Sequence, residues 1–448
     1  MNSRKFSNMR HTGGGRNVLL LALVIVALQC GIITPVTLAQ AEPLEWEHSG
    51  LGNANGSRSR LAERGFTYMF TEDLIASYNA SGGIETGGAI ASRLVGFANW
   101  ELGKYTSLIN SSIRTSFAWY IGDDINEKTG TFFKPNTNYL DPQVRLYELY
   151  WSQDFSEEQI NLHVGRLGFG PEEFGYTSFL YEYQSAGFSS NPGSFFANQP
   201  TTTFSEAVST WGARMLFSPT GKDYDIRVGI YDGWPRDQGR TSAHGLDWSV
   251  GFDKASLLVG EFAYKFNQDP EDTGLPGNYK IGIMYDTGSF SRYDVPESSK
   301  RGNTGYYFIF DQMIFSERTK KGADPNHPSN WKVGKYRNHP PDEGLYVWGS
   351  AVVNPDTSIN LFPFWLTGGI HYKGPFKNRP ADRIGIGYRY GYMTDSLALA
   401  DESATEAYYH YQINPAFTLS INLQYIKNPG GGAVPNAFVP SLGLSIRY

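Results

Sequence analysis

Apolar and polar residues alternate along short segments that recur through most of this 448-residue chain. An alternation with a period of two is typical of a β-strand whose two faces meet different surroundings. One face of each segment carries aliphatic and aromatic residues, and the other carries Arg, Asn, Gln or Gly. The clearest examples are 113–121, 224–231, 383–392, 409–413, 417–425 and 442–448. The pattern predicts an all-β protein.

Two β architectures produce such strands. In a soluble β-sandwich the apolar face points into a core, whereas in a transmembrane β-barrel it meets lipid and the polar face lines a wet lumen. Aromatic residues near the strand ends and glycines on the polar face favour the barrel. The mean hydropathy of -0.38 is too low for a bundle of membrane helices. We therefore expect a transmembrane antiparallel β-barrel, with a secreted soluble β-sandwich that binds glycans as the alternative.

The N-terminus has the layout of a secretory signal peptide. Four basic residues, the last of them Arg16, precede an apolar run at 18–28 that is shorter than the roughly 20 residues of a transmembrane helix. Ala39 and Ala41 then form a cleavage site of the small-x-small type. We expect cleavage before Glu42.

The single cysteine of the chain, Cys30, lies in this N-terminal segment. We therefore expect an exported protein whose mature part has no disulfide and is held together by its hydrogen-bonded strands. The expected location is the outer membrane. The expected division of the chain is a signal peptide at 1–41, a periplasmic N-terminal segment at 42–65 and a transmembrane barrel at 66–448.

The length suits a barrel of sixteen strands, since it allows about 25 residues for each strand and its connection. The segment from 168 to 210 lacks clean alternation and is rich in Gly, Pro, Phe and Tyr, so we expect it to fold inward and narrow the pore. A second segment, 318–343, has the composition of a surface loop. The last strand ends on the aromatic Tyr448, which resembles the signal that outer-membrane barrels present to their insertion machinery.

Six short motifs occur in order along the mature chain. They are RLAERG at 60–65, RLYELY at 145–150, VGRL at 164–167, GLYVWG at 344–349, GGIHYKGPF at 368–376 and QYIKNPGG at 424–431. In this order they resemble the carbohydrate-selective porin B family, the OprB-type outer-membrane channels. Residues 50–56 depart from the Trp-Gly-Gly element that is usual in that family, and Glu172 and Glu173 stand where aspartates are commoner.

The resemblance implies a barrel of sixteen strands with an inward-folded loop, through which monosaccharides such as glucose diffuse passively. The residue chemistry agrees, because sugar hydroxyls need both donors and acceptors and sugar C–H faces stack on aromatic rings. A general or cation-preferring diffusion channel on the same barrel is the main alternative. The expected partners are small sugars, outer-membrane lipid and lipopolysaccharide, and the insertion machinery.

Other classes of function lack their sequence signals. The formal net charge of -6 argues against a nucleic-acid-binding surface. No P-loop, Rossmann fingerprint or nucleophile elbow occurs, and no histidine has a second histidine at metal-ligand spacing. We therefore expect no enzyme activity, no cofactor and no metal site.

Glu172 and Glu173 lie on the expected constriction segment. There they would accept hydrogen bonds from sugar hydroxyls and filter solutes by charge; the alternative is that they are solvated loop charges. Adjacent carboxylates do not by themselves set the ~5 or ~6.5–9.5 Å separation that glycoside hydrolysis requires, so hydrolysis is not expected.

Several arginines are candidates for the lumen wall. Arg145 and Glu148 would face opposite sides of a regular strand, so both can line the lumen only with a bulge or a position near the rim. Arg166 is expected to face the lumen. On a regular strand it would lie on the same face as the apolar Leu162 and Val164, so a lumenal position requires the strand to end at Arg166.

Arg214 and Arg227 fall on the polar faces of their strands. There they would bind sugar hydroxyls or pair with carboxylates of the wall. Trp211 and Trp234 would stack on sugars or belong to the aromatic girdle at the membrane interface.

Overall fold

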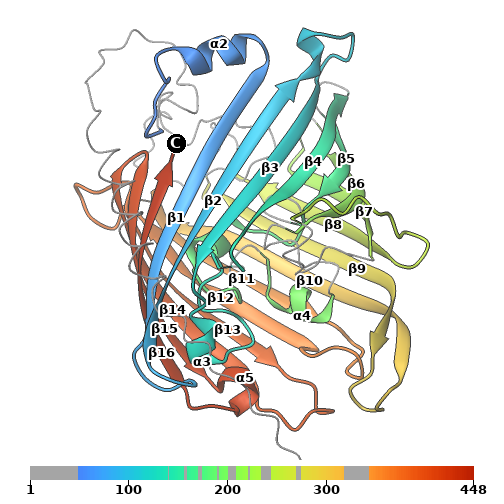
Figure 1. Ribbon diagram of the computed structural model, residues 1–448, viewed down its shortest axis with the longest axis vertical. Coiled ribbons are helices and arrows are strands. Elements are labelled where there is room, and N and C mark those ends of the chain that lie inside the picture. Colours follow the sequence, from blue (N-terminus) through green and yellow to red (C-terminus); the bar gives the residue numbers. More distant parts are fainter. Residues whose placement is uncertain are drawn as a thin grey trace, which may run out of the picture. The chain divides into compact units, whose positions relative to one another are not determined.

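The computed structural model describes residues 49–139, 141–155, 159–169, 174–188, 191–199, 208–219, 222–233, 244–268, 274–316 and 343–448. Within these residues, sixteen strands form one closed antiparallel barrel (Figure 1). The predicted sixteen-stranded barrel is confirmed.

The strands tilt around the barrel and are joined by connections of very different lengths. They are β1 (Phe66–Asn79), β2 (Gly87–Glu101), β3 (Ser111–Gly122), β4 (Gln143–Phe155), β5 (Ile160–Leu167), β6 (Thr210–Phe217), β7 (Tyr224–Asp232), β8 (Ser256–Phe266), β9 (Gly277–Ser291), β10 (Ser299–Phe315), β11 (Gly344–Val353), β12 (Phe364–Lys373), β13 (Arg383–Tyr392), β14 (Glu402–Asn414), β15 (Phe417–Lys427) and β16 (Ala437–Arg447). The short helical elements are α2 (Ser57–Glu63), η2 (Leu102–Lys104), α3 (Asn126–Thr129), η3 (Ser178–Glu182), α4 (Ser194–Asn198) and α5 (Pro429–Gly432). None of the helices in these stretches is long and apolar enough to cross a membrane.

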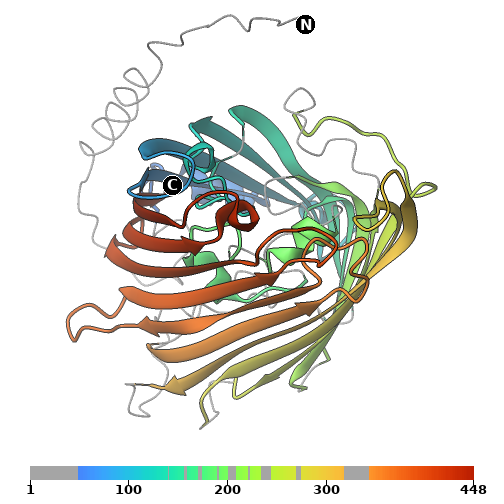
Figure 2. The ribbon, with the colours of Figure 1, turned by 90° about the horizontal axis from the view of Figure 1, so that it is seen from below.

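Each strand pairs with the strands next to it in the chain, and β1 also pairs with β16. This last pairing sets Thr71 opposite Arg447 and Ser77 opposite Ser441. Figure 2 shows the resulting ring of strands around a lumen. Closure leaves no free sheet edge, so every strand has a partner on both sides.

The wall has the two different faces that the alternation predicts. On β7, Ile226, Val228 and Ile230 are exposed on the outside of the barrel, whereas Asp225 and Arg227 are buried on the inside. Apolar side chains are therefore exposed on the outside and charged side chains face the lumen, which is the distribution expected of a membrane barrel.

Two connections fold into the lumen (Figure 2). The first, 123–142, joins β3 to β4 and contains α3; the second, 168–209, joins β5 to β6 and contains η3 and α4. They are hydrogen-bonded to each other, since Thr137 N–H donates to the Gln184 carbonyl oxygen over 2.8 Å. The second connection is the one that the sequence predicts to narrow the pore, and we call it the inward segment.

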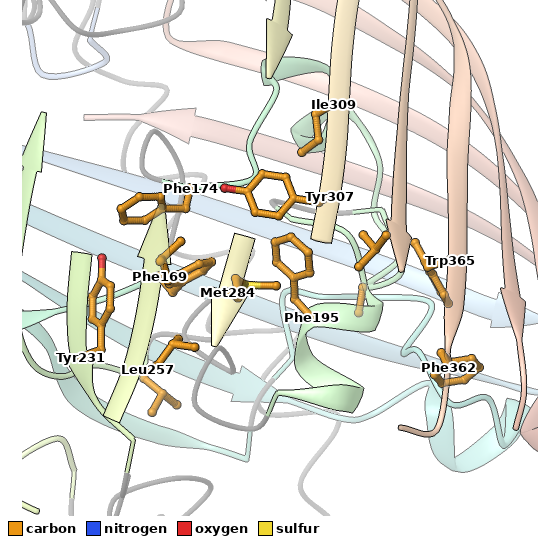
Figure 3. Packing of buried hydrophobic residues seen from close by; sticks show 14 of the residues in the cluster. Phe169, Phe174, Phe195, Tyr231, Leu257, Met284, Tyr307, Ile309, Phe362 and Trp365 are labelled. Carbon is orange, nitrogen blue, oxygen red and sulfur yellow. The ribbon is translucent and has the colours of Figure 1, made fainter. Parts of the chain in front are cut away.

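Aromatic rings of the inward segment fill part of the lumen with an apolar core (Figure 3). Phe169, Phe174 and Phe195 are fully buried. Phe169 packs edge-on against Tyr231 of β7, and Phe195 lies against Tyr307 of β10. A second cluster joins the segment to β10, β11 and β14. The two clusters pack the inward segment against β7–β12 and β14.

The helix α2 fastens the two strands that close the barrel. Arg58 of α2 is buried, and its guanidinium donates hydrogen bonds to the carbonyl oxygens of Tyr68 over 3.1 Å and of Tyr448 over 3.0 Å. Tyr68 belongs to β1 and Tyr448 follows β16. One side chain therefore satisfies buried carbonyl groups on both sides of the closure.

Some of the expectations concern residues outside the described ranges. They are the signal peptide at 1–41, the surface loop at 318–343 apart from its last residue, and the three candidate site residues Glu172, Glu173 and Trp234.

Candidate functional site

A lumen-facing carboxylate holds the inward segment against the wall. Glu406 of β14 is fully buried and accepts hydrogen bonds from the backbone N–H groups of Gln184 over 2.7 Å and of Ser185 over 3.1 Å. The side-chain amide of Asn422 donates to the same carboxylate over 2.8 Å. Buried N–H groups without a partner are costly, so this acceptor fixes the path of the segment.

Glu182, at the end of η3, ties the same segment to two strands. Its Oε2 atom lies 3.0 Å from Arg383 Nε on β13 and 2.9 Å from His410 Nδ1 on β14. Burial raises the pKa of Glu182, but the charge of Arg383 and the hydrogen bond with His410 outweigh burial and hold the pKa below its ordinary value. The anchor is therefore an ionised carboxylate.

Arg227, one of the predicted wall arginines, faces the lumen and belongs to a third anchor. Its Nη1 atom lies 2.6 Å from Glu261 Oε1, and its Nη2 atom lies 3.3 Å from Asp225 Oδ2. The other oxygen of Glu261 accepts hydrogen bonds from the Gly175 backbone N–H over 2.7 Å and from the Tyr307 hydroxyl over 2.9 Å. Arg227 therefore neutralises a buried carboxylate that holds the inward segment.

An ion pair of β1 and β2 and an exposed tyrosine of the inward segment are further polar groups inside the barrel. Asp73 of β1 and Arg93 of β2 are directly opposite each other in the sheet, with 3.0 Å between Oδ2 and Nη2. Ser445 of β16 donates to the other oxygen of Asp73 over 2.6 Å. Tyr181 of η3 is 38% exposed and lies near enough to Arg93 to interact with its charge. We take Asp73, Arg93, Ser445 and Tyr181 as the candidate pore constriction and call them the constriction.

A bulge on β4 brings Arg145 and Glu148 to the same side of the wall. The register with β3 shifts next to Glu148, which lies opposite Ser116, and leaves Tyr147 as an extra residue. Arg145 is buried on the lumen side. Glu148 accepts a hydrogen bond over 3.0 Å from the backbone N–H of Gly168, where the inward segment begins. Of the two explanations that the spacing allowed, a bulge or a rim position, the bulge is the one observed.

Arg214 of β6 also faces the lumen. Its Nε atom lies 2.9 Å from His163 Nδ1, and its guanidinium carbon lies 5.6 Å from the centre of the Tyr150 ring. Arg114 of β3 is opposite Tyr150 in the sheet and is exposed. Two arginines and Glu148 therefore line the lumen between the constriction and β6.

Arg166 and Trp211 lie on the outer side of the wall, so the lumenal position expected for Arg166 is wrong. Arg166 is opposite Trp211 in the sheet and alternates with Leu167, which packs in the lumen. The connection between β7 and β8 covers both residues, since Arg166 donates to the carbonyl oxygen of Asp247 and Trp211 packs against Trp248. The expectation assumed that β5 ends before Arg166. Instead β5 continues to Leu167 and alternates regularly, so Arg166 lies on the same outer face as Leu162 and Val164.

Sequence reasoning did not single out Asp73, Arg93, Tyr181 or Glu182. Arg93 carried a signal that could have been used. It is the one charged residue between the first and last residues of β2, and a single charge within a membrane strand is expected to face the lumen. The two residues of η3 lie in a segment without periodicity, so no pattern indicated their position.

The constriction can exchange contacts with a polar solute. It presents guanidinium donors, carboxylate acceptors and an aromatic ring to the lumen. Across the stretches of chain that the structure describes, no group of three or more His, Cys, Asp or Glu side chains is arranged to hold a metal ion.

Comparisons with known proteins agree with this architecture. Porin B of Pseudomonas aeruginosa is 25% identical to this chain over 89% of this chain and 91% of its own length. The high-pH structure of Pseudomonas putida OprB matches with a TM-score of 0.76 at 20% identity, and it covers 92% of this chain and 100% of its own. The low-pH structure of the same protein matches with a TM-score of 0.54 at 16% identity. These two structures share the fold of this chain.

The match to a family extends over most of the chain. Residues 87–448 fit the family described as carbohydrate-selective porin, OprB family. This match and the barrel fold both indicate an outer-membrane sugar channel rather than an enzyme. The chain therefore belongs to the OprB family of carbohydrate-selective porins.

Proposed function

We propose that this protein lets monosaccharides, in particular glucose-like sugars, diffuse passively across the outer membrane into the periplasm. The observation that carries the proposal is the Asp73–Arg93 ion pair on the lumen face of the wall. Tyr181 of the inward segment, which is 38% exposed, interacts with the charge of Arg93. The pair offers N–H donors and carboxylate acceptors to hydroxyl groups, and the ring offers a face on which sugar C–H groups stack. A monosaccharide uses all three.

Passage through such a constriction is an exchange of hydrogen bonds. A sugar that enters gives up water at its hydroxyls and binds Arg93 and Asp73 instead. These two side chains already bind each other, and Ser445 donates to Asp73, so a new contact replaces an existing one and its net gain is small. Weak net binding suits a channel, because a tight site would stop the flux.

We extend the proposal to features that rest on the sequence. Residues 1–41 direct export, and the strand that ends at Tyr448 is recognised by the insertion machinery. Glu172 and Glu173 add acceptors on the inward segment. The apolar outer face meets outer-membrane lipid and lipopolysaccharide.

A liposome swelling assay on the purified protein tests the proposal. The permeants are glucose, a disaccharide, a zwitterionic amino acid close to glucose in size, and a potassium salt. We expect glucose to enter faster than the amino acid. Entry ordered by size alone would instead support a general diffusion channel, and preferred entry of the cation would support a cation channel.

A pair of double variants ties the result to the constriction. Asp73→Asn with Arg93→Gln keeps the size of both side chains and removes both charges, so we expect the preference for glucose to fall. The matched control is Asp294→Asn with Arg292→Gln, an exposed ion pair of 2.6 Å outside the strands. Equal glucose preference in both double variants would remove the constriction pair from the site.

A further inference from the structure

Phe97 exposes an aromatic ring to the lumen at a distance from the constriction. It has the parity of Arg93 on β2, lies opposite Ser116 of β3, and is 42% exposed. The lumen-facing rings of Tyr120 and Tyr147 on the neighbouring strands are 2% and 9% exposed. Lumen faces of membrane barrels are polar, so an exposed apolar ring in this position calls for a functional reason.

The position of Phe97 along the strand sets it apart from the constriction. Four residues separate it from Arg93, which corresponds to about 13 Å along a strand. It lies toward Glu101, where β2 ends next to Gly65 and the helix α2. A solute at Phe97 therefore stands beyond the constriction, on the side of the barrel where α2 lies.

Charged groups of both signs lie on the two strands that follow β2, on one side of the ring. Arg114 of β3 is exposed and lies opposite Asn99, so it is the diagonal neighbour of Phe97, at roughly 7–8 Å across the strand pair. Ser116, directly opposite Phe97 on β3, donates a hydrogen bond over 3.4 Å to Glu148 of β4. A guanidinium on the adjacent strand and a carboxylate on the strand after it thus lie on the same side of the exposed ring.

We propose that Phe97, Arg114 and Glu148 form a second sugar-binding site in the lumen. The inference rests on the proposed transport of sugars and extends it to a place that the constriction does not include. The ring stacks on the C–H face of a cyclic sugar, while Arg114 donates to its hydroxyls and Glu148 accepts from them. The ligand class is therefore the pyranose sugars, because open-chain polyols carry hydroxyls without a rigid apolar face.

Two weak sites in series suit a selective channel. A sugar that leaves the constriction meets Phe97 before it reaches open water, so it regains contacts as it loses those of Arg93 and Asp73. Multiple weak sites keep binding favourable enough for entry and weak enough for release.

Sugar titration of single channels in planar bilayers tests the site. Glucose and mannitol are titrated separately, and the sugar concentration that gives half of the maximal reduction in ion current is measured. For Phe97→Ala we expect the half-maximal glucose concentration to rise between about two-fold and about ten-fold, with little change for mannitol. Phe97→Tyr keeps the ring and should titrate like the unaltered protein.

The matched control is Phe308→Ala. Phe308 lies on the outer face of β10 with a similar exposure of 40%, and it touches neither the constriction nor the second site. Heat-modifiable mobility in detergent gels shows that each variant has a closed barrel, and Phe97→Leu replaces Phe97→Ala if the latter does not assemble.

The outcomes separate the two proposals. An unchanged glucose titration for Phe97→Ala, together with a change for the Asp73 and Arg93 double variant, would overturn the second site and leave the proposed function standing. Unchanged titrations for both would overturn both. An equal shift for glucose and mannitol would show that Phe97 only narrows the lumen, which also overturns the second site.

Discussion

Arg145 and Glu148 point to the same side of β4 although three positions separate them, because Tyr147 is an extra residue in the pairing with β3. On a regular strand one of the two charges would meet lipid, at a cost of about 2–4 kcal/mol for an arginine at the bilayer midplane. Tyr147 itself packs with Ala118 and Tyr120 in the lumen. The bulge therefore adds a lumen side chain while both charges keep lumenal positions.

Deletion of Tyr147 should leave the barrel closed. The residues that remain alternate regularly, with Arg145 and Glu148 still on the lumen face, and the lost ring should widen the lumen beside them. We expect unchanged heat-modifiable mobility and a higher ion conductance. Deletion of Leu162 is the control, because β5 pairs without a bulge and loss of one residue moves its side chains to the wrong face. Failure of the Tyr147 deletion to assemble would contradict the argument.

Replacement of Glu406 should loosen the inward segment. Glu406→Ala leaves the N–H groups of Gln184 and Ser185 without their acceptor, and each unsatisfied buried group costs about 1–3 kcal/mol. We expect a lower unfolding temperature and larger fluctuations of the open-channel current. Glu406→Gln keeps one acceptor oxygen and should show a smaller effect. A quiet channel of normal conductance in Glu406→Ala would show that the other anchors suffice.

The Glu182 anchor should withstand mild acid. Its folded pKa lies below the ordinary value of 4.5, so its contribution to stability is fully present above about pH 4.5 and is lost as the pH falls through the lowered folded pKa. We expect the difference in unfolding temperature between the unaltered protein and Glu182→Gln to be constant from about pH 7 to about pH 5 and to shrink at lower pH. A difference that already shrinks near neutral pH would assign the effect to another group.

The barrel wall could be predicted from the sequence because membrane strands obey a strict physical rule. Each residue faces either lipid or lumen, so parity alone places Ile226 outside and Arg227 inside. The same rule places Arg166 outside, and the expected strand end that would have reversed this parity does not occur. Errors in the wall therefore arise from assumed irregularities, such as strand ends, that parity does not reveal.

The lumen contents could be predicted only in part. The absence of alternation indicates that a segment leaves the wall, but it does not indicate where that segment attaches. Glu182 binds Arg383 and His410, which are some 200 positions away in the sequence, and neither partner carries a local signal for this contact. For this reason the position of Tyr181 at the constriction follows from the fold alone.

Arg389 and Glu402 form a fully buried ion pair between β13 and β14, with 3.0 Å between Nη2 and Oε1. The guanidinium of Arg389 lies 5.2 Å from the centre of the Phe133 ring in the first inward connection. The other oxygen of Glu402 accepts hydrogen bonds over 3.0 Å from the backbone N–H groups of Phe132 and Gly430. The pair therefore joins the wall to the connection between β3 and β4.

Breaking one side of this pair should cost more than removing both sides. Arg389→Met leaves the Glu402 charge buried without its partner, which typically costs about 3–5 kcal/mol, whereas Arg389→Met with Glu402→Gln removes both charges. We expect the double variant to be more stable than Arg389→Met alone, as measured by urea unfolding from detergent or lipid in a double-mutant cycle. Additive effects of the two substitutions would show that the pair contributes no coupling energy and that Arg389 acts only through its packing against the aromatic rings.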